Sequence, residues 1–276
     1  MDTAIANPIS ISSLLASYGS AASPLVIDVR RAPAFAADTT MLAGATWRDP
    51  FATEEWIKFL PRERNIVVYC VHGHEISKNA CAALRQAGLK AEYLEGGIEA
   101  WHEHGGAMVK KHASLSVPSA INQPSRWITR ERPKIDRIAC PWLIRRFIDP
   151  MAEFIFVPTT DVLQAATTQG ATPYDVPNVQ FSHRGEECSF DAFIHDFEIN
   201  DPLLNELANI VRGADTGVPS LTPQSPGLLA ISLGLSALYP NDHEMLEHGM
   251  VVYDALYAWL KRARAEVHNA AMFAKP

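Results

Sequence analysis

Three short apolar runs, separated by segments with helical spacing, constrain the fold of the first half of the chain more than any other feature. The runs are LVIDV (25–29), IVVYC (66–70) and AEYLE (91–95). Short runs of this kind are typical of strands, and strands that alternate with helices form parallel sheets. We therefore predict an α/β fold for this half, with a parallel sheet and flanking helices.

A helix is predicted directly after the second run, in SKNACAALRQAGLK (77–90). Its apolar positions Cys81, Leu84 and Leu89 recur at helical intervals, and Gly88 lies near its end. Ser77 is a residue type that favours the N-cap. We expect the helix to begin at Ser77, immediately after a loop that contains Cys70.

The second half has a different pattern. The stretch AMVKKHASLSVPSAINQPSR (107–126) gathers Ser, Pro, Asn and Gln without a sustained period, which is typical of a linker. Beyond it the spacing is mostly helical, and only FIFVP (154–158) and NVQFSH (178–183) resemble strands. We predict a first domain over residues 1–110, a linker over 111–125 and a mainly α-helical domain over 126–276, in which 227–240 forms a buried helix.

Composition excludes several protein classes. The 276 residues are 47% hydrophobic and 20% charged, as in globular proteins, and the formal net charge of −7 favours neither nucleic acid nor an acidic membrane as partner. The beginning of the chain lacks a secretory signal pattern, and no apolar stretch is long enough for membrane insertion, so we expect a cytoplasmic protein. Cys70, Cys81, Cys140 and Cys188 form no CxxC pair and should be free thiols.

The segment YCVHGHEIS (69–77) carries the strongest chemical pattern. A strand that ends in Cys70, a turn at Gly73 and a following helix place the sulfur among backbone N–H groups at the positive end of a helix dipole. This environment favours the thiolate, which is the nucleophilic form of cysteine. His72 and His74 can add positive charge nearby. A buried thiol that merely precedes a turn is the alternative interpretation.

The first half resembles a rhodanese domain over about residues 8–110. The resemblance lies in VIDVRRAPAF (26–35), LAGATW (42–47), the Cys70 segment and YLEGGIEAWHEHGGAMV (93–109). It implies that Cys70 carries sulfur and that Asp28 and Arg30 form the Asp-x-Arg element of the family near the site. Glu95, Gly96, Gly97 and Trp101 match a segment with a structural role. The implied anion-binding loop comprises Val71, His72, Gly73, His74, Glu75, Ile76 and Ser77.

This loop departs from the rhodanese pattern Cys-x-x-Gly-x-Arg-Ser, because its serine comes one residue later. The greater length is similar to that of dual-specificity phosphatases and arsenate reductases. Those enzymes need an arginine at the end of the loop to clamp an oxyanion, and this chain has Ile76 there and Glu75 beside it. Sulfur transfer is therefore favoured, while oxyanion reduction or hydrolysis and an inactive sensor domain stay open as alternatives.

The resemblance implies a ping-pong sulfurtransferase. Cys70 would take sulfur from thiosulfate or a similar sulfane-sulfur donor, hold it as a persulfide and pass it to cyanide or a thiol acceptor. No metal or organic cofactor is required for this chemistry.

A locally basic segment, RWITRERPKIDRIACPWLIRRFIDP (126–150), opens the second half. Pro141 suits the first position of a helix that runs to about Ile148, which would place Cys140 at the N-cap. The residues of this segment that we select as anion ligands are Arg137, Cys140, Arg145 and Arg146.

Residues 126–265 resemble the C-terminal domain of the chromate-resistance protein family. The resemblance rests on the basic segment, PYDVPNVQFSHRGEECSFDAFIHDF (173–197) and the later helical segments. It implies a link to chromate or sulfate oxyanion stress. The alternative function of the protein is therefore that of a non-catalytic regulator that responds to an oxyanion or a metal through this domain. Metal binding is chemically possible although no spacing matches a metal motif; the candidate ligands are His183, Cys188, His195, His243 and His248.

Overall fold

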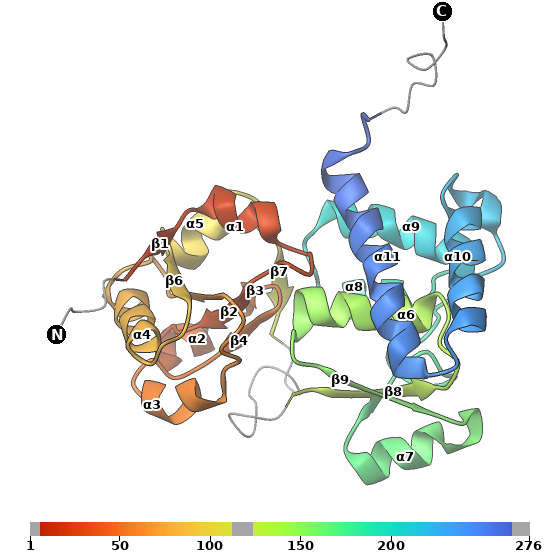
Figure 1. The fold of residues 1–276 in the computed structure, drawn as a ribbon, viewed down its shortest axis with the longest axis horizontal. Helices are drawn as coiled ribbons and strands as arrows, with labels where there is room; N and C mark the ends of the chain where they lie inside the picture. Colours follow the sequence, from red (N-terminus) through yellow and green to blue (C-terminus); the bar gives the residue numbers. More distant parts are fainter. Residues whose placement is uncertain (1–5, 112–123, 267–276) are drawn as a thin grey trace, which may run out of the picture.

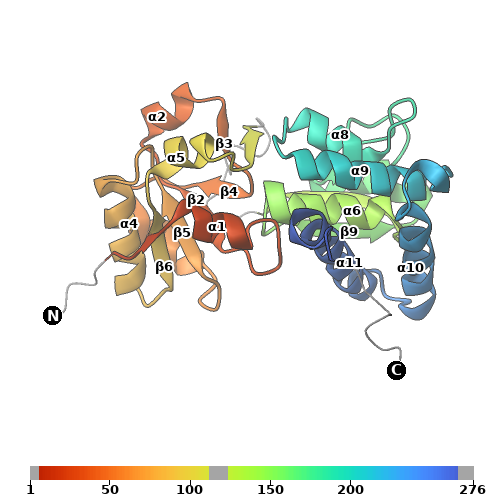
Figure 2. The ribbon, with the colours of Figure 1, turned by 90° about the horizontal axis from the view of Figure 1, so that it is seen from above.

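The computed structural model describes residues 6–111 and 124–266. Figures 1 and 2 show two lobes side by side, the first with a central sheet and the second with mostly helices. The predicted α/β first half and mainly helical second half are both confirmed. Most of the predicted linker lies outside the described residues.

A five-stranded parallel sheet forms the centre of the first lobe. Its order is β1 (Pro8–Ile9), β6 (Ala91–Leu94), β5 (Ile66–Tyr69), β2 (Leu25–Asp28) and β4 (Ala45–Trp47). β2 and β5 are buried along their whole length, as expected for central strands covered on both faces. The three predicted strands are therefore confirmed, and all of them end at one edge of the sheet.

Helices cover both faces of this sheet, and a small strand pair adjoins it. The pair joins β3 (Thr40–Leu42) to β7 (Met108–Lys110) in antiparallel fashion, so the stretch that we read as irregular from residue 107 begins with a strand. Figure 2 shows α4 and α5 on either side of the sheet. The helices are α1 (Ile11–Ser17), α2 (Ala32–Ala37), α3 (Thr53–Trp56) with a 3₁₀ turn (Ile57–Phe59), α4 (Glu75–Gln86) and α5 (Gly97–Glu103).

The second lobe combines a small parallel sheet with a helical cluster. The sheet has the order β10 (Thr172–Pro173), β8 (Arg126–Arg130), β9 (Glu153–Val157). α7 lies on one face of the sheet and the other helices on the opposite face (Figure 1). The helices are α6 (Asp136–Leu143), a π-helical turn (Ile144–Ile148), 3₁₀ turns (Thr159–Asp161 and Pro219–Leu221), α7 (Val162–Gln169), α8 (Ser189–Asp196), α9 (Pro202–Asp215), α10 (Ser225–Leu238) and α11 (Asp242–Arg262).

Two strand predictions in this lobe are corrected. The segment RWITR forms β8, which the sequence reading missed, because its arginines obscured the alternation between Trp127 on one face and Ile128 on the other. NVQFSH is not a strand, because its pairing is limited to an isolated bridge between Phe181 and Tyr174. The Phe181 ring stacks on the Phe193 ring, with centroids 4.4 Å apart.

The predicted helix start at Pro141 is wrong. α6 begins at Asp136 and places Cys140 and Pro141 inside the helix, where both are buried. Proline removes one backbone hydrogen bond in a helix interior, and a π-helical turn follows, in which Asp149 N donates to Ile144 O at 2.7 Å. Cys140 is therefore not at a helix N-terminus, and burial raises the pKa of its thiol.

α10 is not the buried helix that its composition suggested. Its buried positions include Ser225, Ser232 and Ser236, whereas Leu238 is 72% exposed. Small side chains face the core because α9 lies very close, and a Cβ added at Gly213 would lie 2.3 Å from Ser225 Oγ. No helix within residues 6–111 and 124–266 is long and apolar enough to cross a membrane.

The two lobes share one hydrophobic core. The Tyr18 ring of the first lobe contacts both Trp101 and Phe147, with centroid distances of 4.8 and 6.2 Å. Gly44 N donates to Phe147 O at 2.6 Å, and Lys261 Nζ donates to Tyr18 O at 3.0 Å. Phe147 also packs edge-on against Tyr257 of α11. The interface between the lobes, which we call the seam, is therefore packed with buried side chains as a hydrophobic core is.

Truncation of Phe147 tests this shared core. Because its side chain is fully buried, Phe147→Ala should lower the free energy of unfolding by about 3–5 kcal/mol. Phe51→Ala, at a 74% exposed position, should change it by less than about 0.5 kcal/mol. Urea denaturation measures both, and a loss below about 1 kcal/mol for Phe147→Ala would contradict a continuous core.

Candidate functional site

Cys70 lies at the carboxyl edge of the five-stranded sheet, directly after β5. Ligands of open α/β sheets bind in the crevice outside this edge. The residue is 6% exposed, and its Sγ lies 3.3 Å from Ser77 Oγ. We call residues 70–77 the cysteine loop.

The helix after Cys70 begins earlier than the sequence predicted. α4 starts at Glu75 with His74 as N-cap, so Ser77 lies in its first turn. Ser77 Oγ donates to His74 O at 3.1 Å, which ties the hydroxyl back to the start of the helix. The irregular part of the loop therefore ends at His74, and residues 75–77 belong to the helix.

Unpaired backbone N–H groups dominate the cysteine loop. Within the described part of the chain, the N–H groups of residues 71–77 donate to no other group, and the first intrahelical bond joins Lys78 N to His74 O at 3.1 Å. The first N–H groups of a helix have no partner inside the helix and favour an anion. The loop thus presents donors and a positive helix end beside the sulfur.

A double-glycine turn holds the loop in place. Gly97 has φ +63° and lies so close to the loop that an added Cβ would be 2.4 Å from Cys70 O and 2.3 Å from Val71 O. Ile98 N donates to Cys70 O at 3.0 Å. Gly73 approaches Leu94 O in the same way. The structural role expected for Gly96 and Gly97 therefore has a physical basis: only glycine permits this contact.

The two loop histidines are exposed and lie beside each other. Their ring centroids are 5.6 Å apart, and His72 Nδ1 lies 2.9 Å from Glu99 Oε2. Glu75 is also exposed. An anion that approaches the loop therefore meets two imidazoles and the carboxylates of Glu75 and Glu99 besides the backbone N–H groups.

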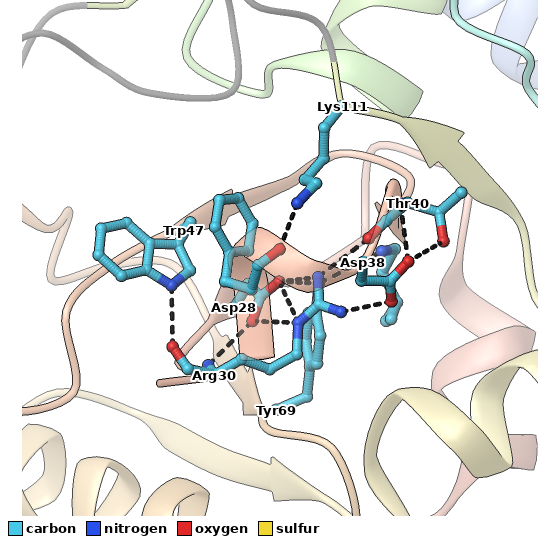
Figure 3. Close-up of polar contacts among 9 residues, drawn as sticks. Asp28, Arg30, Asp38, Thr40, Trp47, Tyr69 and Lys111 are labelled. Carbon is cyan, nitrogen blue, oxygen red and sulfur yellow. Dashed lines mark hydrogen bonds and ion pairs between the residues drawn. The ribbon is translucent and has the colours of Figure 1, made fainter. Parts of the chain in front are cut away.

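Asp28 and Arg30 form a buried ion pair at the end of β2 (Figure 3). Arg30 Nη2 lies 2.7 Å from Asp28 Oδ2, and Arg30 Nη1 lies 2.7 Å from Asp38 Oδ2. Tyr69 Oη donates to Asp28 Oδ2 at 2.9 Å. The arrangement ties the ends of β2 and β5 to the loop before β3.

This ion pair does not line the cysteine loop. Tyr69 reaches Asp28 on the face of the sheet that joins the larger core, whereas Cys70 packs with Val29 on the opposite face. Adjacent residues of a strand point to opposite faces. The Asp-x-Arg element therefore supports the strand ends through the backbone instead of contacting an anion bound at Cys70.

A second polar group lies inside the helical lobe. We call Asp136, Asp175 and Asp215 with His183 the acidic cluster. His183 Nε2 lies 3.6 Å from Asp136 Oδ2, 3.5 Å from Asp175 Oδ1 and 3.2 Å from Asp215 Oδ2. Hydrogen bonding to the carboxylates of Asp175 and Asp215 raises the pKa of His183 to about 10, and burial raises the pKa of Asp136 well above its usual range.

Comparison with known families assigns both lobes. Residues 12–104 match the rhodanese-like domain, and residues 127–260 match the domain described as ChrB, C-terminal domain. The chain joins a rhodanese-like domain to a ChrB C-terminal domain.

Individual relatives cover parts of the chain. Protein ChrB of Cupriavidus metallidurans is 34% identical over 143 residues, which span 51% of this chain and 43% of that protein. The chain thus matches less than half the length of this relative. A rhodanese-related protein from Thermoplasma volcanium is 28% identical, with 37% of this chain and 97% of that chain covered and a TM-score of 0.33. A protein from Lactobacillus plantarum, also 28% identical, covers 36% of this chain and 85% of its own, with a TM-score of 0.32.

The arginines selected in the ChrB C-terminal domain are paired with acids. Arg137 Nε lies 3.3 Å from Asp175 Oδ2, Arg145 Nη1 lies 2.6 Å from Glu247 Oε1, and Arg146 Nη2 lies 2.8 Å from Asp254 Oδ2. The predicted basic patch is therefore largely neutralised and is not a free cationic surface. Cys140 is fully buried and cannot meet an anion at the surface.

The predicted metal ligands of the ChrB C-terminal domain do not gather at one place. Cys188 is the buried N-cap of α8, close enough to Asp136 for a side-chain hydrogen bond, and burial raises the pKa of its thiol. His195 is exposed, 3.6 Å from Glu187, while His243 packs on Phe156 and His248 stacks on Tyr239. Of the five candidates only His183 enters the acidic cluster.

Sequence reasoning missed the three aspartates that surround His183. Asp136 lies on α6, Asp175 follows β10 and Asp215 ends α9. No spacing in the sequence predicts that these elements converge. Asp175, with φ +50°, and Ile135, with φ +40°, adopt a backbone conformation that residues with side chains rarely use. Such strain is found where surrounding contacts fix a functional geometry, but it is not visible in the sequence.

Substitution of Arg30 tests the support of the rhodanese-like domain. Arg30→Met leaves the buried Asp28 carboxylate without its cation, and we expect the free energy of unfolding to fall by about 3–5 kcal/mol. Arg31→Met, at the exposed neighbouring position, should change it by less than about 0.5 kcal/mol. Equal effects of the two substitutions in urea denaturation would contradict the supporting role of this ion pair.

Proposed function

We propose that this protein is a sulfurtransferase that carries sulfane sulfur as a persulfide of Cys70. The observation that carries the proposal is the set of backbone N–H groups of residues 71–77, which follow Cys70 into the first turn of α4 and have no hydrogen-bond partner in the described part of the chain. Free N–H groups at a helix N-terminus suit an anionic donor and an anionic persulfide. The match of residues 12–104 to the rhodanese-like domain supports the same chemistry.

The reaction has two half-steps. The Cys70 thiolate attacks the outer sulfur of thiosulfate, the sulfur–sulfur bond of the donor breaks, and sulfite leaves with the bonding electron pair. The loop amides stabilise the negative charge on the remaining persulfide. Cyanide or a thiolate then attacks the outer sulfur, and Cys70 departs as thiolate, so no external oxidant or reductant is consumed.

The loop disfavours oxyanion hydrolysis. Glu75 and Ile76 stand near the end of the loop, where a phosphatase would need an arginine. Arg30 cannot replace it, because the guanidinium is held by Asp28 and Asp38 on the other face of the sheet. The donors that remain are backbone amides, and the loop lacks the bidentate guanidinium with which a phosphatase clamps the oxygens of a phosphoryl group.

We further propose that the fused ChrB C-terminal domain connects this activity to chromate resistance. The match over residues 127–260 and the similarity to Protein ChrB support this connection. The shared core between the lobes, with Phe147 at the seam, gives the helical domain a direct mechanical contact with the sheet that carries Cys70.

The test is steady-state formation of thiocyanate from thiosulfate and cyanide. Cys70→Ser should reduce kcat by at least about 1,000-fold, since removal of a nucleophile leaves only residual catalysis. Cys81→Ser is the matched control, because Cys81 is a buried thiol on the adjoining helix with no place in the mechanism. Activity retained in a folded Cys70→Ser protein would overturn the proposal.

An oxyanion-responsive regulator is a second candidate function, which one cavity favours. The cavity lies at the seam and is lined by Arg64 of the first lobe and by Arg145 and Arg146 of the second. Arg64 has no carboxylate within ion-pair distance among the described residues, and burial together with the charge of Arg146 lowers its pKa. An anion in this cavity would relieve that repulsion.

Sulfate binding tests the regulator. The regulator predicts saturable sulfate binding by calorimetry that persists in Cys70→Ser and weakens roughly 10-fold or more in Arg64→Gln, because one charge-assisted hydrogen bond contributes about 1.5–3 kcal/mol. Arg62→Gln, at an exposed position two residues away, is the control. Absence of sulfate binding, or equal binding by both arginine variants, would contradict a seam anion site.

A further inference from the structure

The acidic cluster contains more acceptors than one histidine can satisfy. His183 Nε2 faces three aspartate oxygens at 3.2 to 3.6 Å. A ring nitrogen carries at most one proton and can direct it at only one of them. The three carboxylates therefore converge on one N–H group, which cannot hydrogen-bond to all of them at once.

The spacing around His183 Nε2 is that of neighbouring ligand atoms in a metal site. Arginine–carboxylate pairs in the same lobe range from 2.6 Å in Arg212–Asp191 to 3.4 Å in Arg126–Glu153, so the cluster lies at the long end of that range. In a tetrahedral zinc site with bonds of about 2.0–2.1 Å, neighbouring ligand atoms are about 3.3 Å apart. The distances from His183 Nε2 to the three carboxylates, 3.2 to 3.6 Å, match the edge of such a coordination polyhedron.

Asp136 provides an independent observation. Its side chain is buried, with 1% exposure, and its Oδ1 has no hydrogen-bond partner among the described residues. Its Oδ2 accepts from Ser189 N, at 2.5 Å, and faces His183 Nε2. A buried, unpaired carboxylate oxygen costs free energy unless an ion or proton compensates it. Among the described residues, no donor compensates Asp136 Oδ1.

Neighbouring groups fix the other ligands. Asp175 Oδ2 is held by Arg130 and Arg137, while its Oδ1 accepts from Ser189 Oγ at 2.8 Å and faces His183. Outer partners of this kind orient the carboxylate ligands of metals. The His183 side chain is 42% exposed, which provides a route for an ion from solvent.

We propose that Asp136, Asp175 and His183 bind a divalent first-row transition metal ion, with Asp215 as the adjacent fourth donor. The ligand atoms of the first three residues lie within 4.8 Å of one another. Mixed imidazole and carboxylate ligands suit Zn²⁺, Mn²⁺, Fe²⁺ or Co²⁺. The site is separate from the cysteine loop, and it gives the ChrB C-terminal domain a chemical feature of its own.

Zinc titration of the chelator-treated full-length protein tests the proposal. We expect saturable binding of one Zn²⁺ per chain by calorimetry. Asp136→Asn should lower the affinity for Zn²⁺ by roughly 100-fold or more, because substitution of even the groups that hydrogen-bond to metal ligands lowers metal affinity by about 10–100-fold. His183→Gln, at the partly exposed ligand, should weaken binding similarly and serves as the second variant if Asp136→Asn does not fold. Bound Co²⁺ should show the absorption of nitrogen and oxygen ligands without a thiolate charge-transfer band.

His195→Ala is the matched control, because His195 is exposed on the neighbouring helix outside the cluster. It should leave the affinity for Zn²⁺ unchanged. The proposal is overturned if the wild type binds no Zn²⁺ saturably, or if folded His183→Gln binds as tightly as the wild type. Cys70→Ser should bind Zn²⁺ normally, so the outcome does not depend on sulfur transfer.

Discussion

Close contact between two backbone segments is the constraint on which the cysteine site depends. The main chain at Gly97 lies against the carbonyls of Cys70 and Val71, and any side chain at residue 97 would collide with both. The carbonyls of Cys70 and Val71 accept from Ile98 N and Glu99 N of α5, so the N–H groups on the other side of these two trans peptides, those of Val71 and His72, point away from α5. An anion-binding loop needs such fixed donors, because donors that must reorganise contribute less to transition-state stabilisation.

The seam between the lobes places two kinds of chemistry in one body. Tyr18 and Trp101 from the first lobe and Phe147 from the second pack as one aromatic group. The sheet edge with Cys70 lies on one side of this group, and the acidic cluster lies within the helical lobe on the other. Because these rings belong to one continuous hydrophobic core, the two lobes are packed together as the interior of a single domain is.

Local pattern predicted the first lobe well and the second less well. LVIDV and IVVYC supply the two strands that are buried along their whole length, and AEYLE supplies a strand buried at both ends. The position of the Cys70 loop follows from where the second run ends. The missed features depend on tertiary contacts: α4 begins at Glu75 although Ser77 is the better N-cap type, and Pro141 lies inside α6 because α8 and α11 pack around that helix. α10 turns its serines inward because of the close approach of α9. The acidic cluster joins residues up to 79 positions apart, from Asp136 to Asp215, and no local pattern can bring them together.

Transfer of a sulfur atom to Cys70 can be measured as the mass of the intact protein after incubation with thiosulfate. We expect the wild type to gain the mass of one sulfur atom, peptide mapping to place it on Cys70, and cyanide to remove it. A folded wild-type protein whose mass stays unchanged, or whose added sulfur resides on Cys81, Cys140 or Cys188, would contradict sulfur transfer by Cys70.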